Sequence, residues 1–442
     1  MKSNFIQSSK NLLLDFLYTP GGFSFFPSPI FWASNFKYSD LSDSLKHLPS
    51  FNSQEGKTTT LYIHIPFCDK ICNYCNCFKK KLLLSEEIDR YIEYLEQEAK
   101  IYYNIIWKKI KISSIFIGGW TPNLLSISQF KQLHSIIVKY YDISGIEWFI
   151  LDGHPNYYSR EKLKYFSSIW VTRVTFAVQS FDNFVLEKAN RESYSINQLH
   201  ELIQFASSVN IQVNIDLLIW LQWQTLDSIK NDFQLCSNLK VNNVSVHFMM
   251  LSDNMKYSLP SNYHELIKGT KILLQNIKLP YSSTNITEDH YASTKNTTLS
   301  LWAEAVTNIY STSVFQKPKL KKYYQFLEDN KVPVSRYIAC NKRQEMKKYF
   351  YLNILHGVSI DGFFKLFNES IYDVFWKEIK FLFLQKVTIL KDNKIVPNKS
   401  DLEVLLHANI LFLDELQSHN FVPLWDKDIS NYFLATWELI DK

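Results

Sequence analysis

Glycine is scarce in this chain, and long apolar runs are absent. Only 10 of 442 residues are glycine, where roughly 7% is usual in globular proteins. No stretch of about 20 apolar residues, the length that a membrane-spanning helix needs, occurs in the sequence. The apolar segment Asn11–Tyr18 is broken by Asp15 and lacks a basic start and a cleavage site, so we expect no signal peptide. We therefore expect a cytoplasmic protein without a membrane span.

Charge and cysteine usage narrow the function classes further. The 48 basic and 43 acidic residues leave a net charge of only +5, so we expect no nucleic-acid partner. Four of the six cysteines lie within ten residues, at Cys68, Cys72, Cys75 and Cys77, whereas the other two are isolated. A secreted disulfide protein would spread its cysteines along the chain. The clustering instead indicates a metal or cluster site in a reducing compartment.

Short apolar runs alternate with helix-like segments between residues 58 and 300, after a leader of residues 1–57. Such alternation predicts parallel βαβ units and an α/β fold that closes into a partial (β/α)6 barrel. Ligands of such barrels bind at the carboxyl ends of the strands. The expected strands are Leu61–Ile65, Ser114–Ile117, Trp148–Leu151, Arg173–Val178, Val213–Ile219 and Val244–Phe248. The expected helices are Ser85–Trp107, Ser128–Tyr141, Arg160–Phe166, Ser195–Ser207 and Leu226–Cys236.

The pattern changes near residue 300. Charged, helix-like stretches at Lys321–Asn330, Asn341–His356, Ile371–Gln385 and Lys399–Glu415 predict a mostly helical C-terminal domain over residues 301–442. A short hairpin is expected at Val387–Ile395, around Lys391-Asp392-Asn393, and would give this domain a winged-helix-like character.

The cysteine motif follows the first expected strand, in the segment Tyr62-Ile-His-Ile-Pro-Phe-Cys68 and onwards. Its spacing, Cys-x3-Cys-x2-Cys, places three thiolates on one tight loop, and three thiolates can hold three irons of a [4Fe–4S] cube. The fourth iron would then be open to a further ligand. The alternative is a structural zinc loop, but zinc sites more often add a second, distant cysteine pair, and this sequence has none.

These residues resemble the radical S-adenosylmethionine (SAM) superfamily, and more narrowly the oxygen-independent coproporphyrinogen III oxidase-like family, which includes haem chaperones and anaerobic haem-degrading enzymes. The resemblance runs strongly from Tyr62 to Phe248 and weakly through Arg343–Asn368. It implies a [4Fe–4S] cluster that cleaves SAM to a 5′-deoxyadenosyl radical, which abstracts hydrogen from the substrate. It also implies a porphyrinogen substrate and an electron donor such as flavodoxin or ferredoxin.

The resemblance also assigns roles residue by residue. Cys68, Cys72 and Cys75 match the cluster ligands, and Arg191 in Asn190-Arg191 matches the residue that meets the SAM carboxylate. An arginine suits a carboxylate, and acids at strand ends suit an amine or hydroxyls. No residue is assigned as catalytic. The positions that match SAM contacts are Tyr62, Tyr74, Gly119, Trp120, Thr121, Asp152, Gln179, Arg191 and Asp216.

Several tryptophans stand where this family has glycine. Trp120 replaces the third glycine of the SAM-binding turn, and Trp170, Trp220 and Trp223 replace glycines elsewhere. The largest side chain at positions that need none, in a glycine-poor chain, suggests that the source reads a codon, UGA, as glycine. The competing interpretation is a decayed relative that has lost SAM binding. Two further departures, Asp152 for glutamate and Ala177 for glycine, are not explained by such decoding.

Cys77 bears on which branch of the family the sequence resembles. Cys77 supplies a fourth cysteine, as in the decarboxylating oxidases, and is either an accessory group or a small buried residue. Oxidative decarboxylation of coproporphyrinogen III propionates is therefore the first prediction. A haem chaperone, a methyltransferase-like radical SAM enzyme and a remnant that no longer binds SAM are the alternatives.

Overall fold

The computed structural model describes residues 36–37, 58–75 and 79–249, and then 265–266, 269–270, 273, 281–283, 296–301, 306–309, 312–316, 319–339, 342–354 and 357–399. Cys77, the leader except for 36–37, and the expected helix beyond residue 399 lie outside these ranges. No helix within them combines the length and apolarity needed to cross a bilayer.

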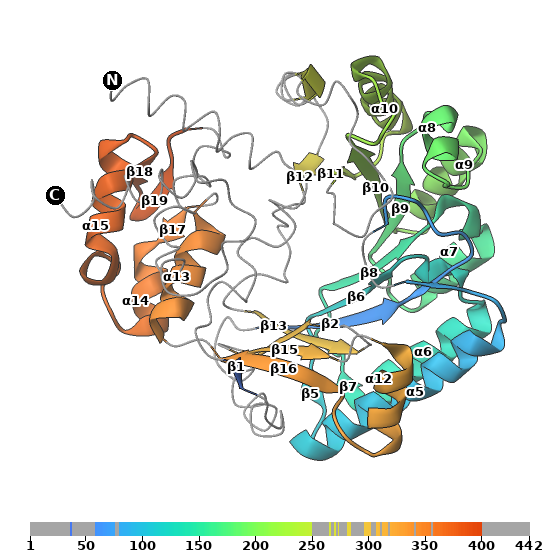
Figure 1. Cartoon of the computed structure of the whole chain (residues 1–442), viewed down its shortest axis with the longest axis horizontal. Helices are drawn as coiled ribbons and strands as arrows, with labels where there is room; N and C mark the ends of the chain where they lie inside the picture. The colour runs from blue at the N-terminus through green and yellow to red at the C-terminus, as the bar shows by residue number, and fades with distance from the viewer. Residues whose placement is uncertain are drawn as a thin grey trace.

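Eight parallel strands form the centre of the molecule (Figure 1). The six expected strands are all present, as β2 (Thr58–Ile65), β6 (Ser114–Gly119), β8 (Trp148–Gly153), β9 (Arg173–Gln179), β10 (Gln212–Ile219) and β11 (Asn243–Phe248). They pair in that order, and every pair is parallel. β12 (Tyr281–Ser283) continues the sheet beyond β11, and β13 (Asn296–Leu301) pairs with β2 on the other side. The predicted α/β fold with a parallel sheet is therefore confirmed.

Helices return the chain between successive strands and cover the outer face of the sheet (Figure 1). They are α5 (Glu86–Ile106), α6 (Ile127–Tyr140), α7 (Arg160–Ser168), α8 (Asn183–Lys188), α9 (Ile196–Ser208) and α10 (Leu226–Leu239). Local sequence fixes where they begin: Ser126 and Gln129 form a reciprocal capping box at α6, and Thr225 and Ser228 form one at α10. Their apolar faces and the strands share one continuous core.

Four short antiparallel strands extend the sheet beyond β13. They are β14 (Val306–Ile309), β15 (Thr312–Gln316), β16 (Val334–Ala339) and the two-residue β1 (Phe36–Lys37). Sequence analysis anticipated none of them. α12 (Leu320–Glu328) precedes β16 and packs on α5, where Tyr323 donates a 2.5 Å hydrogen bond to buried Glu98.

A second hydrophobic core lies in the C-terminal part. It is built by α13 (Lys342–Asn353), α14 (Ile360–Phe367) and α15 (Ile371–Leu384), with β17 (Val358–Ser359) and the hairpin β18 (Thr388–Lys391) and β19 (Lys394–Pro397). The expected helices up to residue 385 and the hairpin around Asp392 are present. The first core still includes Leu299, Leu301, Tyr323 and Leu327, and the second begins at Met346, so the domain limits stay a prediction.

Candidate functional site

The cysteine loop lies at the carboxyl end of β2. Cys68 ends the two-residue strand β3 (Phe67–Cys68), which pairs with β4 (Lys80–Lys81) and so closes the base of the loop. Cys68, Cys72 and Cys75 form no disulfide, and Cys68 and Cys75 are buried. The predicted ligands therefore share one short loop at the end of the sheet where ligands of parallel α/β folds bind.

Residues from distant parts of the chain hold this loop in place. Asn190, just after α8, donates from its side-chain amide to the carbonyl of Ile71 at 2.8 Å. The backbone N–H of Asn73 donates to the carbonyl of Ala189 at 2.9 Å. On the other side, the Cys68 Sγ and Thr121 Oγ1 atoms lie 3.3 Å apart.

Arg191 is the centre of the contacts around the loop. One guanidinium nitrogen lies 3.5 Å from Cys72 Sγ and 3.3 Å from the Tyr74 hydroxyl. Another donates to the carbonyl of Ala177 in β9. The structure thus brings together five predicted site residues: Cys68, Cys72 and Tyr74 of the loop, Thr121 of the turn after β6, and Arg191 after α8.

Electrostatics favour keeping Arg191 charged. Burial alone would lower the pKa of its guanidinium, but the neighbouring Tyr74 and Cys72 outweigh this effect and raise it. Burial raises the pKa of Tyr74 well above its ordinary value, so its hydroxyl is neutral. Burial also raises the pKa of the Cys68 thiol to about 11, opposed by the hydrogen bond with Thr121. A fixed positive charge therefore stands beside thiols that become anionic when they bind metal.

The turn after β6 is built by a close approach of main chains. Gly119 has a φ of +120°, and a Cβ there would lie 2.3 Å from the carbonyl oxygen of Ile65. Only glycine fits this position. Half-buried Trp120 follows, with its N–H bonded to the same carbonyl at 3.2 Å, and Thr121 precedes the short helix η1 (Pro122–Leu124).

Asn123 ties this turn to the next strand end. It is fully buried, and its side-chain amide both donates to the His154 carbonyl at 2.9 Å and accepts from the His154 N–H at 3.0 Å. A Cβ on Gly153 would lie 2.3 Å from the Asn123 side chain, so the pair excludes any larger residue at 153. Lys162 of α7 caps the arrangement by donating to the Asn123 carbonyl at 2.6 Å. Sequence reasoning missed both Asn123 and Lys162.

Two predicted acids lie close enough to Tyr158 to influence its hydroxyl. Asp152 in β8 and Asp216 in β10 both act on the buried hydroxyl of Tyr158, whose pKa is raised first by burial and then by these two carboxylates. Asp216 also accepts a 2.8 Å hydrogen bond from Asn214 and lies 3.7 Å from His247. Acids so placed can accept hydrogen bonds from an amine or from hydroxyls.

The remaining predicted contacts lie on β2 and β9. Tyr62 stacks on Phe116, with ring centroids 5.5 Å apart. Gln179 is the last residue of β9 and has a φ of 69°, which turns the chain at the strand end. Buried Asp232 of α10 binds the two residues that follow Gln179. It accepts a hydrogen bond from Ser180 Oγ at 2.8 Å and another from the backbone N–H of Phe181 at 2.7 Å. No sequence pattern pointed to Asp232.

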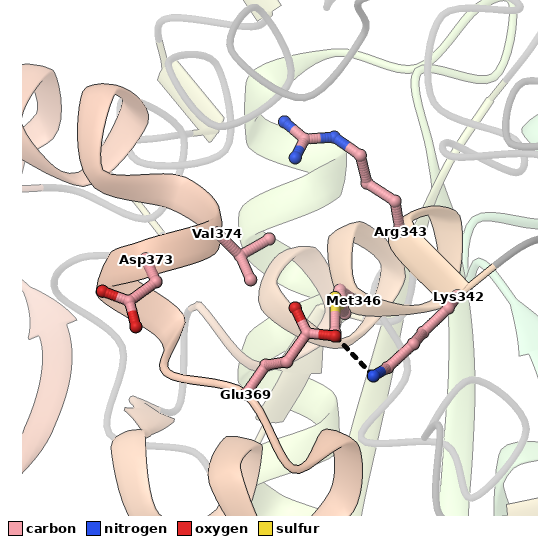
Figure 2. A pocket seen from close by; sticks show the side chains of 6 residues that line it. All are labelled: Lys342, Arg343, Met346, Glu369, Asp373 and Val374. Atoms are coloured by element: carbon pink, nitrogen blue, oxygen red, sulfur yellow. Dashed lines mark hydrogen bonds and ion pairs between the residues drawn. The ribbon is translucent and has the colours of Figure 1, made fainter.

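A pocket of 380 Å³ lies apart from these residues, between α13 and α15 (Figure 2). It is lined by Lys342, Arg343, Met346, Glu369, Asp373 and Val374. Lys342 pairs with Glu369, while Arg343 points away from that pair and lies 3.9 Å from Glu378. Both cations therefore have carboxylate partners.

The donor set of the cysteine loop fits an iron–sulfur cluster, because three cysteines without disulfides on one loop are the ligands that such clusters take. Within the described ranges, no three His, Cys, Asp or Glu side chains form a preformed metal-binding group. Cys77 lies outside the described residues.

Comparison with known proteins agrees with this arrangement. The profile of the radical SAM superfamily matches residues 62–236. The haem chaperone HemW of Lactococcus lactis is 32% identical over 199 residues, which cover 45% of this chain and 51% of that protein. HemW of Bacillus subtilis is 33% identical over 194 residues, covering 43% and 50%. The chain thus spans about half the length of these curated relatives.

Relatives of the oxidase branch match as well. The oxygen-independent coproporphyrinogen III oxidase of Bradyrhizobium diazoefficiens is 26% identical over 174 residues, covering 39% of this chain and 38% of that protein. The solved structure of coproporphyrinogen III oxidase (HemN) from Escherichia coli superposes with a TM-score of 0.73, covering 91% of this chain and 98% of that one at 17% identity. That likeness shows a shared fold. The cofactors of the superfamily are a [4Fe–4S] cluster and SAM. Residues 62–236 of the chain are therefore similar to the radical SAM superfamily, and within it to oxygen-independent coproporphyrinogen III oxidases and HemW haem chaperones.

Proposed function

We propose that this chain binds a [4Fe–4S] cluster through Cys68, Cys72 and Cys75, cleaves SAM, and acts on a tetrapyrrole. The observation that carries the proposal is the meeting of the cysteine loop with Arg191 at the carboxyl end of the parallel sheet. When bound, the cluster supplies the electron that cleaves SAM. A flavodoxin or ferredoxin is the expected source of that electron.

The chain's own residues would bind and orient SAM. Arg191 offers a charged fork to the carboxylate, at a place where its charge is maintained by Tyr74 and Cys72. Asp152 and Asp216 would accept from the amine and the ribose hydroxyls, and Gln179 would contribute an amide at the end of β9. Gly119 and Thr121 would bring main-chain groups close to the methionine part, while Tyr62 and Tyr74 would supply aromatic surface.

Two outcomes for the tetrapyrrole deserve separate tests. Oxidative decarboxylation of coproporphyrinogen III propionates is the first, supported by oxidase relatives and by Cys77. Haem binding without decarboxylation is the second, favoured by the higher identity to proteins named haem chaperone HemW. A methyltransferase-like radical SAM activity is the further alternative.

The test is anaerobic reconstitution with iron and sulfide, followed by measurement of 5′-deoxyadenosine. We expect SAM cleavage, which coproporphyrinogen III stimulates if the chain is an oxidase. Haem binding with no release of CO2 would assign it to the chaperones. Cys72→Ala should lose the cluster absorbance near 400 nm, roughly where iron–sulfur thiolate sites absorb, whereas Cys236→Ala, a buried cysteine of α10, should keep it. Absorbance retained by the first variant would refute the ligand assignment.

A further inference from the structure

Four tryptophans occupy a backbone conformation that suits glycine. Trp107, Trp170, Trp220 and Trp223 have φ angles of 62°, 62°, 70° and 71°. For an L-residue this region is unfavourable, because the Cβ approaches the following carbonyl oxygen. No phenylalanine or tyrosine in the described ranges adopts it, although the chain has 32 and 26 of them. Aromatic bulk therefore does not account for the conformation.

Trp170 ends α7 in a Schellman motif. Its N–H bonds to the Ser167 carbonyl at 3.2 Å, and the N–H of Val171 bonds to the Phe166 carbonyl at 3.0 Å. This position is usually glycine and sometimes asparagine. Four other helices end with the same bond pattern, and there the position is held by Asn190, Asn210, Asn330 and Lys386.

The other positions also have conformations that favour glycine. Trp107 is the left-handed cap of α5, with its N–H bonded to the Tyr103 carbonyl at 2.8 Å. Trp223 is the third residue of a turn that the Gln224 N–H closes onto the Leu221 carbonyl at 3.0 Å. A positive φ at that place of a turn is the type II pattern, which requires glycine or asparagine. Trp220 follows the end of β10.

The indole side chain is exposed at three of these sites. The side chains of Trp107, Trp170 and Trp223 are 85%, 69% and 41% exposed. An indole that is buried could repay an unfavourable backbone, but an exposed one buries little apolar surface. The two other described tryptophans outside the predicted SAM turn behave normally: Trp148 lies in β8 under the Arg173 guanidinium, and Trp376 lies in α15 beside Tyr372.

We infer that the polypeptide made in the source organism carries glycine at positions 107, 170, 220 and 223, because a codon written as tryptophan is decoded as glycine there. Backbone conformation adds position 107 to those suggested by the sequence. It also separates these positions from 148 and 376, which remain tryptophan. Trp120 has no left-handed φ, so glycine at 120 stays a prediction from the sequence alone. The inference does not depend on the proposed function.

The test combines gene sequencing with peptide mass spectrometry of the protein purified from its source. We expect one codon at 107, 170, 220 and 223, peptides that carry glycine at all four, and a different codon with tryptophan at 148 and 376. The last two positions are internal controls in the same polypeptide. Tryptophan at 107 and 170 in the native protein would overturn the inference. Glycine at 148 and 376 would also overturn it, since backbone conformation would then not distinguish the sites.

Discussion

Replacing Trp170 by glycine should stabilise the barrel, although the change removes a large aromatic side chain. Its φ of 62° lies in the left-handed region, and 69% of its side chain is exposed. Relief of the left-handed conformation is worth about 1–2 kcal/mol. The larger entropy of a glycine in the unfolded chain takes back about 0.5–1 kcal/mol. The expected net gain in the free energy of unfolding is therefore about 0.5–1 kcal/mol.

Trp148→Gly is the matched control, since it makes the same substitution at a tryptophan whose φ is not left-handed. Trp148 lies within β8 with an ordinary φ, and the Arg173 guanidinium stands 4.9 Å from its ring. A glycine inside a strand loses about 0.5–1 kcal/mol, and the lost cation–π contact costs about 0.5–1 kcal/mol more. This variant should therefore be less stable than the parent chain.

The assay is urea unfolding of the full chain, followed by far-UV circular dichroism because fluorescence would change with the tryptophan count. The midpoints of the two variants should move in opposite directions around that of the parent. A loss of stability in Trp170→Gly as large as that in Trp148→Gly would refute the strain argument.

Three further predictions concern the site. Asn123→Ala leaves the buried main-chain groups of His154 without their side-chain partner. It should lower the free energy of unfolding, measured by urea titration, by about 2–4 kcal/mol. An unchanged urea midpoint would contradict a stabilising role for these two hydrogen bonds. Burial raises the pKa of Asp232 to about 7 from its ordinary 3.8. The folded chain therefore binds more protons than the unfolded one, and stability should fall as pH rises from about 4 through 7. Asp232→Asn should flatten this part of the pH profile of the unfolding midpoint, whereas two superimposable profiles would disprove the assignment. Arg191→Lys keeps the positive charge but loses the planar donor pair of the guanidinium, so calorimetric titration of the reconstituted protein should show SAM affinity about tenfold lower. Arg160→Lys, at an exposed arginine, is the control. Equal SAM affinities of the two variants would show that Arg191 does not bind SAM.

The parallel part of the fold was predictable because its strands are short apolar runs between amphipathic helices. β10, with seven of its eight residues at least half-buried, carries that signal strongly. β14 and β15 do not, since Val306–Ile309 and Thr312–Gln316 mix apolar with polar residues over four or five positions. Strands this short depend on their neighbours in the sheet, and sequence periodicity does not record those neighbours.

The same contrast holds for the site. The cysteine loop is local, so its spacing alone indicated a cluster ligand set. Asn123 and Asp232 act on main chain 31 and 51 residues away, and neither belongs to a spaced pattern. Their roles follow only from the packing of one strand end against another. Of the four tryptophans with a left-handed φ, three were suggested by the family resemblance. Trp107 was identified only from its position as the cap of α5.

The anchoring of the cysteine loop has a consequence for how the metal arrives. Asn190 and Ala189 hold the loop's main chain from across more than a hundred residues of sequence, and Arg191 reaches over it from the same segment. In small zinc domains the metal supplies the folding energy, so the chain collapses around it. Here hydrogen bonds from the segment after α8 anchor the main chain of the loop. We therefore expect the cluster to be inserted after the protein has folded. Loss of the cluster should then leave a folded protein that can bind a new one.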